Sequence, residues 1–280
     1  MKLIKFILKL SRPRFWLYLA GTYLVGYSAG ITTYHDFIKP EFWVHFLFFL
    51  IPANIFLYGI NDYYDQDTDQ FNLKKQTHEQ LLISQDRKKL KIMLWICVGF
   101  FTILTLWQTT NIARILVIIF LFLSYAYSAP PFRFKAKPFI DSLSNILYGL
   151  PGILAYTQLT NHLPSIEIII AIWCWTSAMH LFSAIPDIVS DHMAGLKTTA
   201  VVLGHRNSLV LCAILWSMMS GIVISERWFG IVGLLSLVYP LIPLCLSLTK
   251  KELTAKVYWW FPYLNAAVGG ALFLMMILSM

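Results

Sequence analysis

Carboxylate side chains that could bind a divalent cation gather in the segment NDYYDQDTD, residues 61–69, directly after a long apolar run. Its polar positions at helical spacing are Asn61, Asp62, Asp65 and Asp69. If the helix predicted for the apolar run continues past residue 60, these four side chains lie mostly on one face. Clustered carboxylates repel one another unless a cation lies between them, and Mg²⁺ is held by one or two carboxylates plus substrate phosphate oxygens. The alternative interpretation is a solvated helix end.

A second acidic pair, Asp187 and Asp191, lies in the segment DIVSD. The two residues are four positions apart and share a helical face, directly after Pro186, which we expect to bend or restart the helix. Such a pair alone is more often an exposed face. Together with residues 61–69 it indicates a site for two cations.

Basic residues lie in the loops that also carry the acidic segments or lie between them. Arg133 and Lys135 occur in YSAPPFRFK, and Lys197 occurs in DHMAGLKTT. Each alone could be only a topology determinant, but proline or glycine fixes the backbone beside them. A pair of cations ringed by Lys and Arg suits a diphosphate, whose charge such a site would neutralise as the diphosphate departs.

The elements that must position these residues are membrane helices. The chain has 280 residues, of which 58% are hydrophobic and 13% charged, and its mean hydropathy is +0.65. This composition excludes an ordinary soluble domain. Nine apolar runs are each about long enough to cross a bilayer. They are residues 15–32, 41–60, 91–109, 112–129, 139–158, 166–186, 208–225, 229–248 and 258–279.

The distribution of basic residues predicts the orientation of these nine spans. All but three of the 22 Lys and Arg residues lie on one side, and the exceptions are Lys39, Arg114 and Arg227. Because cytoplasmic loops retain positive charge, we expect a cytoplasmic N-terminus and both acidic segments on the cytoplasmic face. The net charge of +8 then reflects topology and contact with membrane lipid, and no nucleic-acid partner is expected. We expect an integral protein of a prokaryotic cytoplasmic membrane.

The two acidic segments also suggest an internal repeat, because four spans separate them. We interpret residues 1–280 as a single membrane domain, with spans one to four and five to eight as similar halves and a ninth span added. The four cysteines all lie inside predicted spans without a CxxC pair, so neither a disulfide framework nor a thiolate metal site is indicated.

Two further polar residues lie inside predicted spans, where ionisable groups are costly. Asp141 could act as a base, or it could cap a helix or pair with Lys137. His180 could serve the chemistry, or it could form a hydrogen bond to a neighbouring helix.

At this point the sequence resembles a known family, the UbiA superfamily of intramembrane prenyltransferases. The superfamily's first motif, NDxxDxxxD, is matched at every fixed position by residues 61–69. Its second, DxxDxxxD, is matched by Asp187 and Asp191, whereas Ala184 replaces the first aspartate. Residues 179–204, MHLFSAIPDIVSDHMAGLKTTAVVLG, and residues 127–150 are similar to the branch that elongates lycopene.

The resemblance implies an all-α bundle of nine transmembrane helices around a central cavity that the two motifs cap on the cytoplasmic side. It implies two Mg²⁺ ions on a prenyl diphosphate, held by Asn61, Asp62, Asp65, Asp69, Asp187 and Asp191. Asn61, Asp65 and Asp191 would be the residues most important for catalysis. Diphosphate contacts would come from Arg133 and Lys197, with Lys135 and Arg12 as weaker candidates. Tyr127 would line the path of an allylic cation, which aromatic ring faces can stabilise.

Within this branch the donor would be dimethylallyl diphosphate, and the acceptor would be lycopene or a related acyclic carotenoid. The final cation would lose a proton or add water. Other lipophilic acceptors remain alternatives, among them an aromatic quinone precursor. A membrane transporter is the alternative from another class, but the acidic segments lie at helix ends, and transport sites lie near the bilayer midplane. The oligomeric state is left open.

Overall fold

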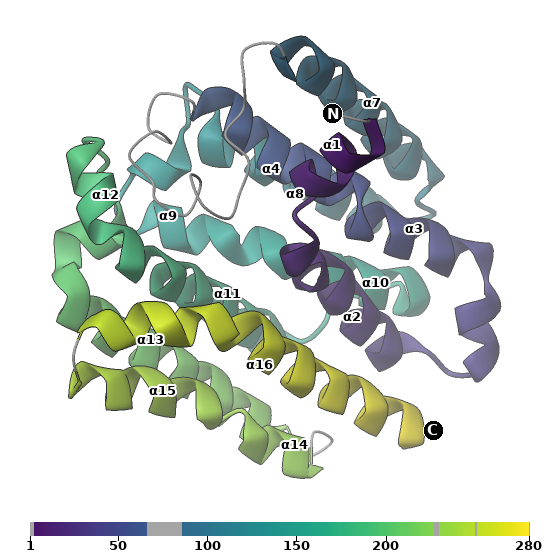
Figure 1. Cartoon of the computed structure of the whole chain (residues 1–280). Helices are drawn as coiled ribbons and strands as arrows, with labels where there is room; N and C mark the ends of the chain where they lie inside the picture. Colours follow the sequence, from purple (N-terminus) through teal and green to yellow (C-terminus); the bar gives the residue numbers. More distant parts are fainter. Residues whose placement is uncertain (1–2, 66–85, 227–229, 250, 280) are drawn as a thin grey trace. The chain divides into compact units, whose positions relative to one another are not determined.

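A computed structural model describes residues 3–65, 86–226, 230–249 and 251–279. Every regular element in these ranges is helical (Figure 1), so the predicted all-α class is confirmed. By compactness the chain divides into two units. The first unit contains residues 1–133 and 150–163, and the second contains residues 134–149 and 164–279.

The first unit contains seven α-helices and three shorter helical segments among the described residues. The α-helices are α1 (Leu3–Leu10), α2 (Thr22–Gly30), α3 (Pro40–Leu50), α4 (Pro52–Tyr64), α7 (Arg87–Trp107), α8 (Asn111–Ser128) and α10 (Leu150–Thr160). The shorter segments are η1 (Pro13–Phe15), the π-helical η2 (Leu17–Gly21) and η3 (Tyr34–Ile38). Helix α2 packs along α10.

The second unit contains seven α-helices and three 3₁₀ segments in its described part. The α-helices are α9 (Ile140–Leu143), α11 (Ile166–Ala184), α12 (Ile188–Met193), α13 (Thr199–Ser225), α14 (Gly230–Leu235), α15 (Val238–Ser247) and α16 (Lys251–Leu278). The 3₁₀ segments are η5 (Phe134–Ala136), η6 (Ser144–Tyr148) and η7 (Ile185–Asp187). Helix α11 packs along α13.

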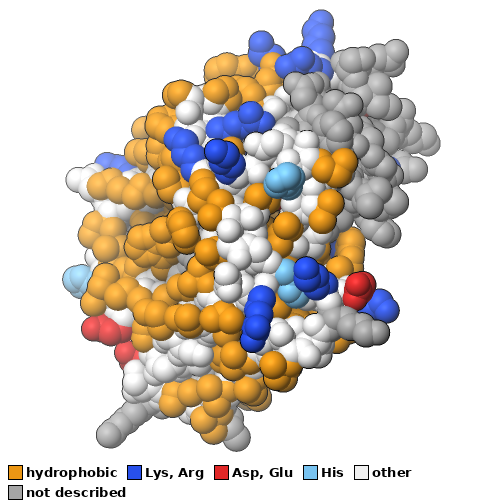
Figure 2. Space-filling model, turned by 90° about the vertical axis from the view of Figure 1, so that its left-hand side faces the viewer, with side chains coloured by type: hydrophobic (Ala, Val, Ile, Leu, Met, Phe, Trp, Pro, Cys, Tyr) orange, Lys and Arg blue, Asp and Glu red, His pale blue; other side chains and the backbone are white. Residues whose placement is uncertain are grey.

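Six helices in the described residues are long and apolar enough to cross a membrane. They span Pro40–Tyr64, Arg87–Trp107, Asn111–Ser128, Ile166–Met193, Thr199–Ser225 and Lys251–Leu278. Hydrophobic side chains cover much of the face shown in Figure 2. Helix α7 also exposes Trp95, Ile103 and Leu106. Such a surface is suited to lipid, as expected of an integral membrane protein.

The other three predicted spans consist of shorter helical pieces. Residues 15–32 pass through η2 into α2, residues 139–158 through α9 and η6 into α10, and residues 229–248 through α14 into α15. The count of nine spans, the central cavity, the single domain with similar halves and the cytoplasmic N-terminus stay predictions.

The helix that leads to the first acidic segment is interrupted at Pro52. Proline lacks a backbone N–H, so the preceding turn loses a hydrogen bond where α3 ends and α4 begins. The Asn54 side chain compensates, because its Nδ2 donates to the carbonyls of Phe49 at 2.8 Å and Leu50 at 3.1 Å. With these hydrogen bonds from the buried Asn54 side chain, one membrane-length segment continues to Tyr64.

A buried polar network joins four segments of the first unit. His45 Nδ1 lies 2.7 Å from the Glu41 carbonyl, so Nδ1 carries the proton and Nε2 accepts. Gln108 and Gln158 donate to Nε2 at 2.8 and 2.9 Å, and the Tyr23 hydroxyl donates to Gln158 at 3.1 Å. Hydrogen bonds of this kind hold helices together in an apolar environment.

An aromatic cluster forms the core of the second unit. The rings of Trp216 and Phe261 stack with centroids 5.5 Å apart, and Phe182 lies 4.5 Å from Phe261. These side chains from α13, α16 and α11 are at most 1% exposed. Their packing holds α11, α13 and α16 together around one apolar centre.

The loop between α2 and α3 is held by the buried carboxylate of Asp36. Its Oδ1 lies 2.7 Å from Lys39 Nζ, and its Oδ2 accepts from the backbone N–H groups of Thr32 and Thr33 at 3.1 and 3.3 Å. Burial alone would raise the pKa of Asp36, but the hydrogen bonds from Lys39 and both amides outweigh it and lower the pKa below 3.8.

This lowered pKa predicts an acid-dependent loss of stability. The contribution of Asp36 is fully present above the unfolded-state pKa and disappears as pH falls through the lower folded-state pKa. The stability difference between the wild type and Asp36→Asn should therefore be constant above about pH 5 and shrink as the pH falls further toward about pH 3. Thermal unfolding of both proteins at each pH measures it. A difference that is independent of pH would contradict the role of the charged carboxylate.

Candidate active site

The first acidic segment lies at the C-terminal end of α4. The helix continues past Ile60 as predicted, but it ends at Tyr64, and Asp65 leaves the helical conformation with φ −108° and ψ 7°. The Asp65 backbone N–H still donates to the Asn61 carbonyl at 3.0 Å. Asp62 and Asp65 are 5% and 1% exposed, so both carboxylates are buried. The predicted ligand Asp69 lies outside the described residues.

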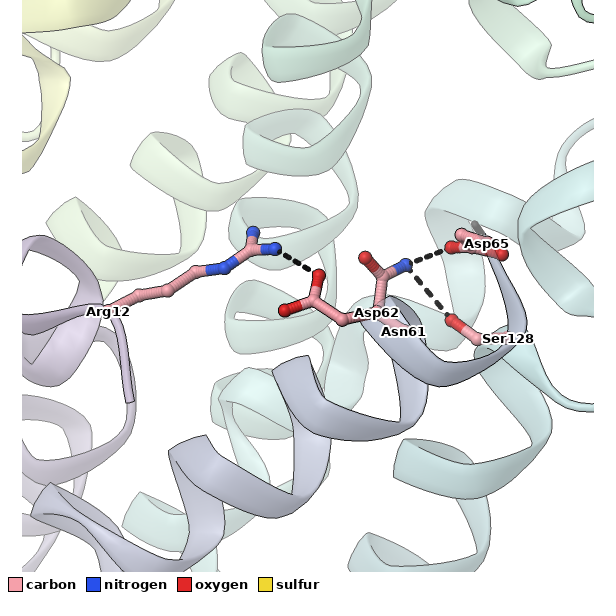
Figure 3. Close-up of polar contacts among 5 residues, drawn as sticks. All are labelled: Arg12, Asn61, Asp62, Asp65 and Ser128. Carbon is pink, nitrogen blue, oxygen red and sulfur yellow. Dashed lines mark hydrogen bonds and ion pairs between the residues drawn. The ribbon is translucent and has the colours of Figure 1, made fainter. Parts of the chain in front are cut away.

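Asn61 holds the side chain of Asp65 in place (Figure 3). Asn61 Nδ2 donates to Asp65 Oδ2 at 2.5 Å and to Ser128 Oγ at 3.1 Å. Ser128 is the last residue of α8 and is buried. One amide therefore joins the end of α4 to the end of α8, and it fixes the orientation of the carboxylate that the motif requires.

Arg12 forms an ion pair with Asp62 in the same unit (Figure 3). Arg12 Nη2 lies 2.8 Å from Asp62 Oδ1, and the guanidinium carbon lies 4.5 Å above the centre of the Tyr58 ring. The side chains are only 13% and 7% exposed. Arg12 has φ 48°, in the left-handed region, at the turn between α1 and Pro13. A strained backbone of this kind persists where surrounding contacts stabilise it.

Breaking this ion pair should destabilise the first unit. Arg12→Gln leaves the Asp62 carboxylate buried without its cation and should lower the free energy of unfolding by about 2 kcal/mol. Lys39→Gln is the matched control, because Lys39 also pairs with a buried aspartate but is 54% exposed. That change should cost at most about 1 kcal/mol. Equal losses in denaturant unfolding of the two variants would contradict a special role for the buried pair.

The second acidic segment lies where α11 gives way to two short helices. Helix α11 ends at Ala184, η7 contains Pro186, and α12 then restarts at Ile188, as expected from the proline. Asp187 ends η7 and Asp191 lies in α12, and both are partly exposed. The pair therefore lies just beyond the C-terminal end of α11, where the second unit carries its acidic segment.

A tight turn follows Asp191 and carries Lys197. The Leu196 N–H donates to the Asp191 carbonyl at 2.9 Å, and the Thr198 hydroxyl lies 3.5 Å from Asp191 Oδ2. Gly195 has φ +70°, which glycine adopts without strain. Lys197 is exposed, so its ammonium group can reach a charged ligand in water.

The remaining predicted substrate contacts fall into both units. Tyr127 in α8 is half-buried, and Arg133 follows α8 with φ 42°. Arg133 Nε is buried and has no hydrogen-bond partner among the residues described. Lys135 in η5 of the second unit is 9% exposed. The structure thus brings Arg12, Asn61, Asp62 and Asp65 together within the first unit, and Asp191 and Lys197 onto one turn of the second.

Asp141 is an acceptor for the ends of two helices. Its carboxylate accepts hydrogen bonds from the Ser142 N–H at 2.8 Å, from the Thr199 N–H at 2.8 Å and from the Thr199 hydroxyl. Of the roles considered for Asp141, helix capping is therefore the one that matches these hydrogen bonds. Sequence reasoning missed Ser128, Thr198 and Thr199. The predicted span begins at residue 208, whereas α13 begins at Thr199 and Thr198 caps it.

The donor chemistry of both acidic segments fits Mg²⁺. Carboxylate and amide oxygens are hard ligands, and Mg²⁺ needs only one or two carboxylates when substrate phosphates and water complete its shell. Across the described ranges, no group of three or more His, Cys, Asp or Glu side chains is arranged to hold a metal by itself.

Comparison with known proteins identifies related sequences over most of the chain. The model of the UbiA prenyltransferase family matches residues 19–265. A lycopene elongase/hydratase from Haloarcula japonica is 37% identical over 267 residues, which cover 95% of this chain and 89% of that protein. A lycopene elongase/hydratase from Haloferax volcanii is 39% identical over 266 residues, covering 93% and 84%.

Solved structures share the fold. A UbiA homologue from Archaeoglobus fulgidus bound to DMAPP and Mg²⁺ aligns with a TM-score of 0.71 at 22% identity. The alignment covers 95% of this chain and 98% of the other. At this level of identity the likeness supports the fold alone.

Proposed function

This chain belongs to the UbiA prenyltransferase family, and from this premise we propose that it transfers a dimethylallyl group to the end of lycopene or a related acyclic carotenoid. Two observations together support the proposal. The chain carries the acidic motifs at helix ends, and its relatives at 37% and 39% identity are named lycopene elongase/hydratase. The resemblance seen in residues 179–204 to the lycopene-elongating branch supports the same acceptor.

The acidic residues would hold two Mg²⁺ ions that bind the diphosphate of the donor. The residues that would supply the ligands are Asn61, Asp62, Asp65, Asp69, Asp187 and Asp191. When bound, Mg²⁺ neutralises the negative charge that develops on the departing diphosphate. Asn61 fixes Asp65 through its 2.5 Å hydrogen bond, which supports a positioning role for the amide beside any role as a ligand.

Basic residues bind the oxygens of the same diphosphate. Arg133 and Lys197 are the principal contacts, with Lys135 and Arg12 in addition. The buried Nε of Arg133 supports this assignment, because a ligand oxygen would satisfy a donor that otherwise carries a desolvation cost. The excess of Lys and Arg in the same loops supports a site that faces the cytoplasm.

Transfer breaks the bond between the allylic carbon and the diphosphate oxygen, and the electron pair leaves with the diphosphate. The terminal double bond of the acceptor supplies the pair for the new carbon–carbon bond. Tyr127 would line the path of the allylic cation, which an aromatic ring face can stabilise. Water then adds to the resulting tertiary cation and releases a proton, in keeping with the hydratase in the names of the relatives.

Expression in cells that accumulate lycopene, followed by mass spectrometry of the pigments, tests the proposal. We expect products heavier than lycopene by one or two five-carbon units, each with one added water, and none with Asp65→Asn. Products without the added water would mean that the tertiary cation loses a proton and is not hydrated. Unchanged lycopene beside folded protein would overturn the carotenoid acceptor and favour an aromatic or other lipid acceptor.

A further inference from the structure

The Asp141 carboxylate is fully buried in the second unit at 0% exposure. A buried charge is costly unless hydrogen bonds replace the lost water. Here Oδ2 accepts from the Thr199 N–H, and Oδ1 accepts from the Ser142 N–H and the Thr199 hydroxyl. Ser142 lies in α9 and Thr199 is the first residue of α13, so the carboxylate lies at the N-terminus of α13, where negative charge is favoured.

Thr199 forms a further hydrogen bond between the start of α13 and the segment that carries Asp141. Its hydroxyl, which donates to Asp141, also accepts from the Phe139 N–H at 2.6 Å. Phe139 has φ 67° and directly precedes α9. The carboxylate and the hydroxyl together tie the chain at residues 139–142 to the start of α13, although Asp141 and Thr199 are 58 positions apart in the sequence.

The start of α13 is also the end of the turn that carries the diphosphate contacts. Thr198 caps α13 by accepting from the Val201 N–H at 3.3 Å, and its hydroxyl lies 3.5 Å from Asp191 Oδ2. Lys197 precedes Thr198 directly. Asp141 therefore fixes one end of this turn, whereas the hydrogen bond between Leu196 and Asp191 closes the other.

We propose that Asp141 is a positioning residue that, through Thr199, holds Asp191 and Lys197 in the arrangement that binds the Mg²⁺ diphosphate complex. This inference rests on the proposed function. This role differs from that of the base considered above, since both oxygens of the carboxylate already accept hydrogen bonds from the protein.

The experiment measures Mg²⁺-dependent binding of dimethylallyl diphosphate to the full chain in lipid nanodiscs, by titration calorimetry. Thr199→Val removes the hydroxyl at nearly constant volume and should weaken binding about tenfold, as loss of an outer-shell contact does at metal sites. Thr199→Ser restores the hydroxyl and should bind like the wild type. Asp141→Asn should weaken binding to a similar extent, and it provides the test if Thr199→Val does not fold.

Ser220→Ala is the structural control. It removes a buried hydrogen bond of the same unit, from Ser220 Oγ to the Ser236 carbonyl at 3.0 Å, away from the turn. It should lower thermal stability and leave the dissociation constant unchanged. Wild-type affinity in a folded Thr199→Val or Asp141→Asn protein would overturn the positioning role alone. A wild type that binds no diphosphate with Mg²⁺ would overturn the proposed function, and this inference with it.

Discussion

Replacing Asp65 by asparagine should lower the rate of prenyl transfer about 1000-fold while leaving the amount of folded protein close to that of the wild type. Asparagine keeps the shape of the side chain and one acceptor oxygen, so the hydrogen bond from Asn61 Nδ2 can persist. The negative charge that would hold Mg²⁺ on the diphosphate is lost. Asp191→Asn should have an effect of the same size, because it removes the corresponding charge from the second motif.

The rate is measured as diphosphate released from dimethylallyl diphosphate by protein in lycopene-containing vesicles, and folding by thermal unfolding. Glu167→Gln is the matched control, since it also removes one negative charge but lies exposed in the first turn of α11. It should leave the rate unchanged. Near-wild-type rates in both aspartate variants would remove the metal and diphosphate site from consideration.

The charged residues of this site can be recognised from the sequence because a membrane protein has few reasons to retain them. Residues 61–69 and the pair Asp187 and Asp191 stand out against long apolar runs, and their spacing follows helical turns. Hydropathy also predicts the all-α membrane class, because each long apolar run must satisfy its backbone hydrogen bonds internally. Family membership follows from the same motifs.

The partners of these residues could not be predicted, because the contacts join distant parts of the chain. Fifty residues separate Arg12 from Asp62, and 67 separate Asn61 from Ser128. Local patterns carry no information on such pairs. For the same reason the interruption of the fifth predicted span was not anticipated. This span begins as α9 and η6, and there Asp141 accepts a hydrogen bond from the Thr199 N–H, 58 positions further along the chain.

A second large effect is expected where α2 packs against α10 in the first unit. Thr22, Gly26 and Gly30 recur every four residues on α2, a spacing of small residues that permits close approach of membrane helices. A Cβ atom at Gly26 would overlap the carbonyl of Gly152 in α10. A Cβ atom at Gly152 would lie 2.8 Å from the Thr22 carbonyl. The obstruction is backbone on both sides, so no side-chain rotation can relieve it.

Gly26→Ala should therefore lower the free energy of unfolding by about 3 kcal/mol, because the two helices must move apart and lose contacts along their length. Gly99→Ala provides the control. Gly99 lies exposed in α7, and a Cβ atom added there would meet no other atom within 4 Å, so alanine should be neutral or stabilise the helix by up to about 1 kcal/mol. Denaturant unfolding in detergent micelles compares the variants. Equal stabilities of the two variants would mean that α2 and α10 do not pack at backbone contact. If Gly26→Ala destabilises the protein and Gly99→Ala does not, the close approach of α2 and α10 accounts for the difference.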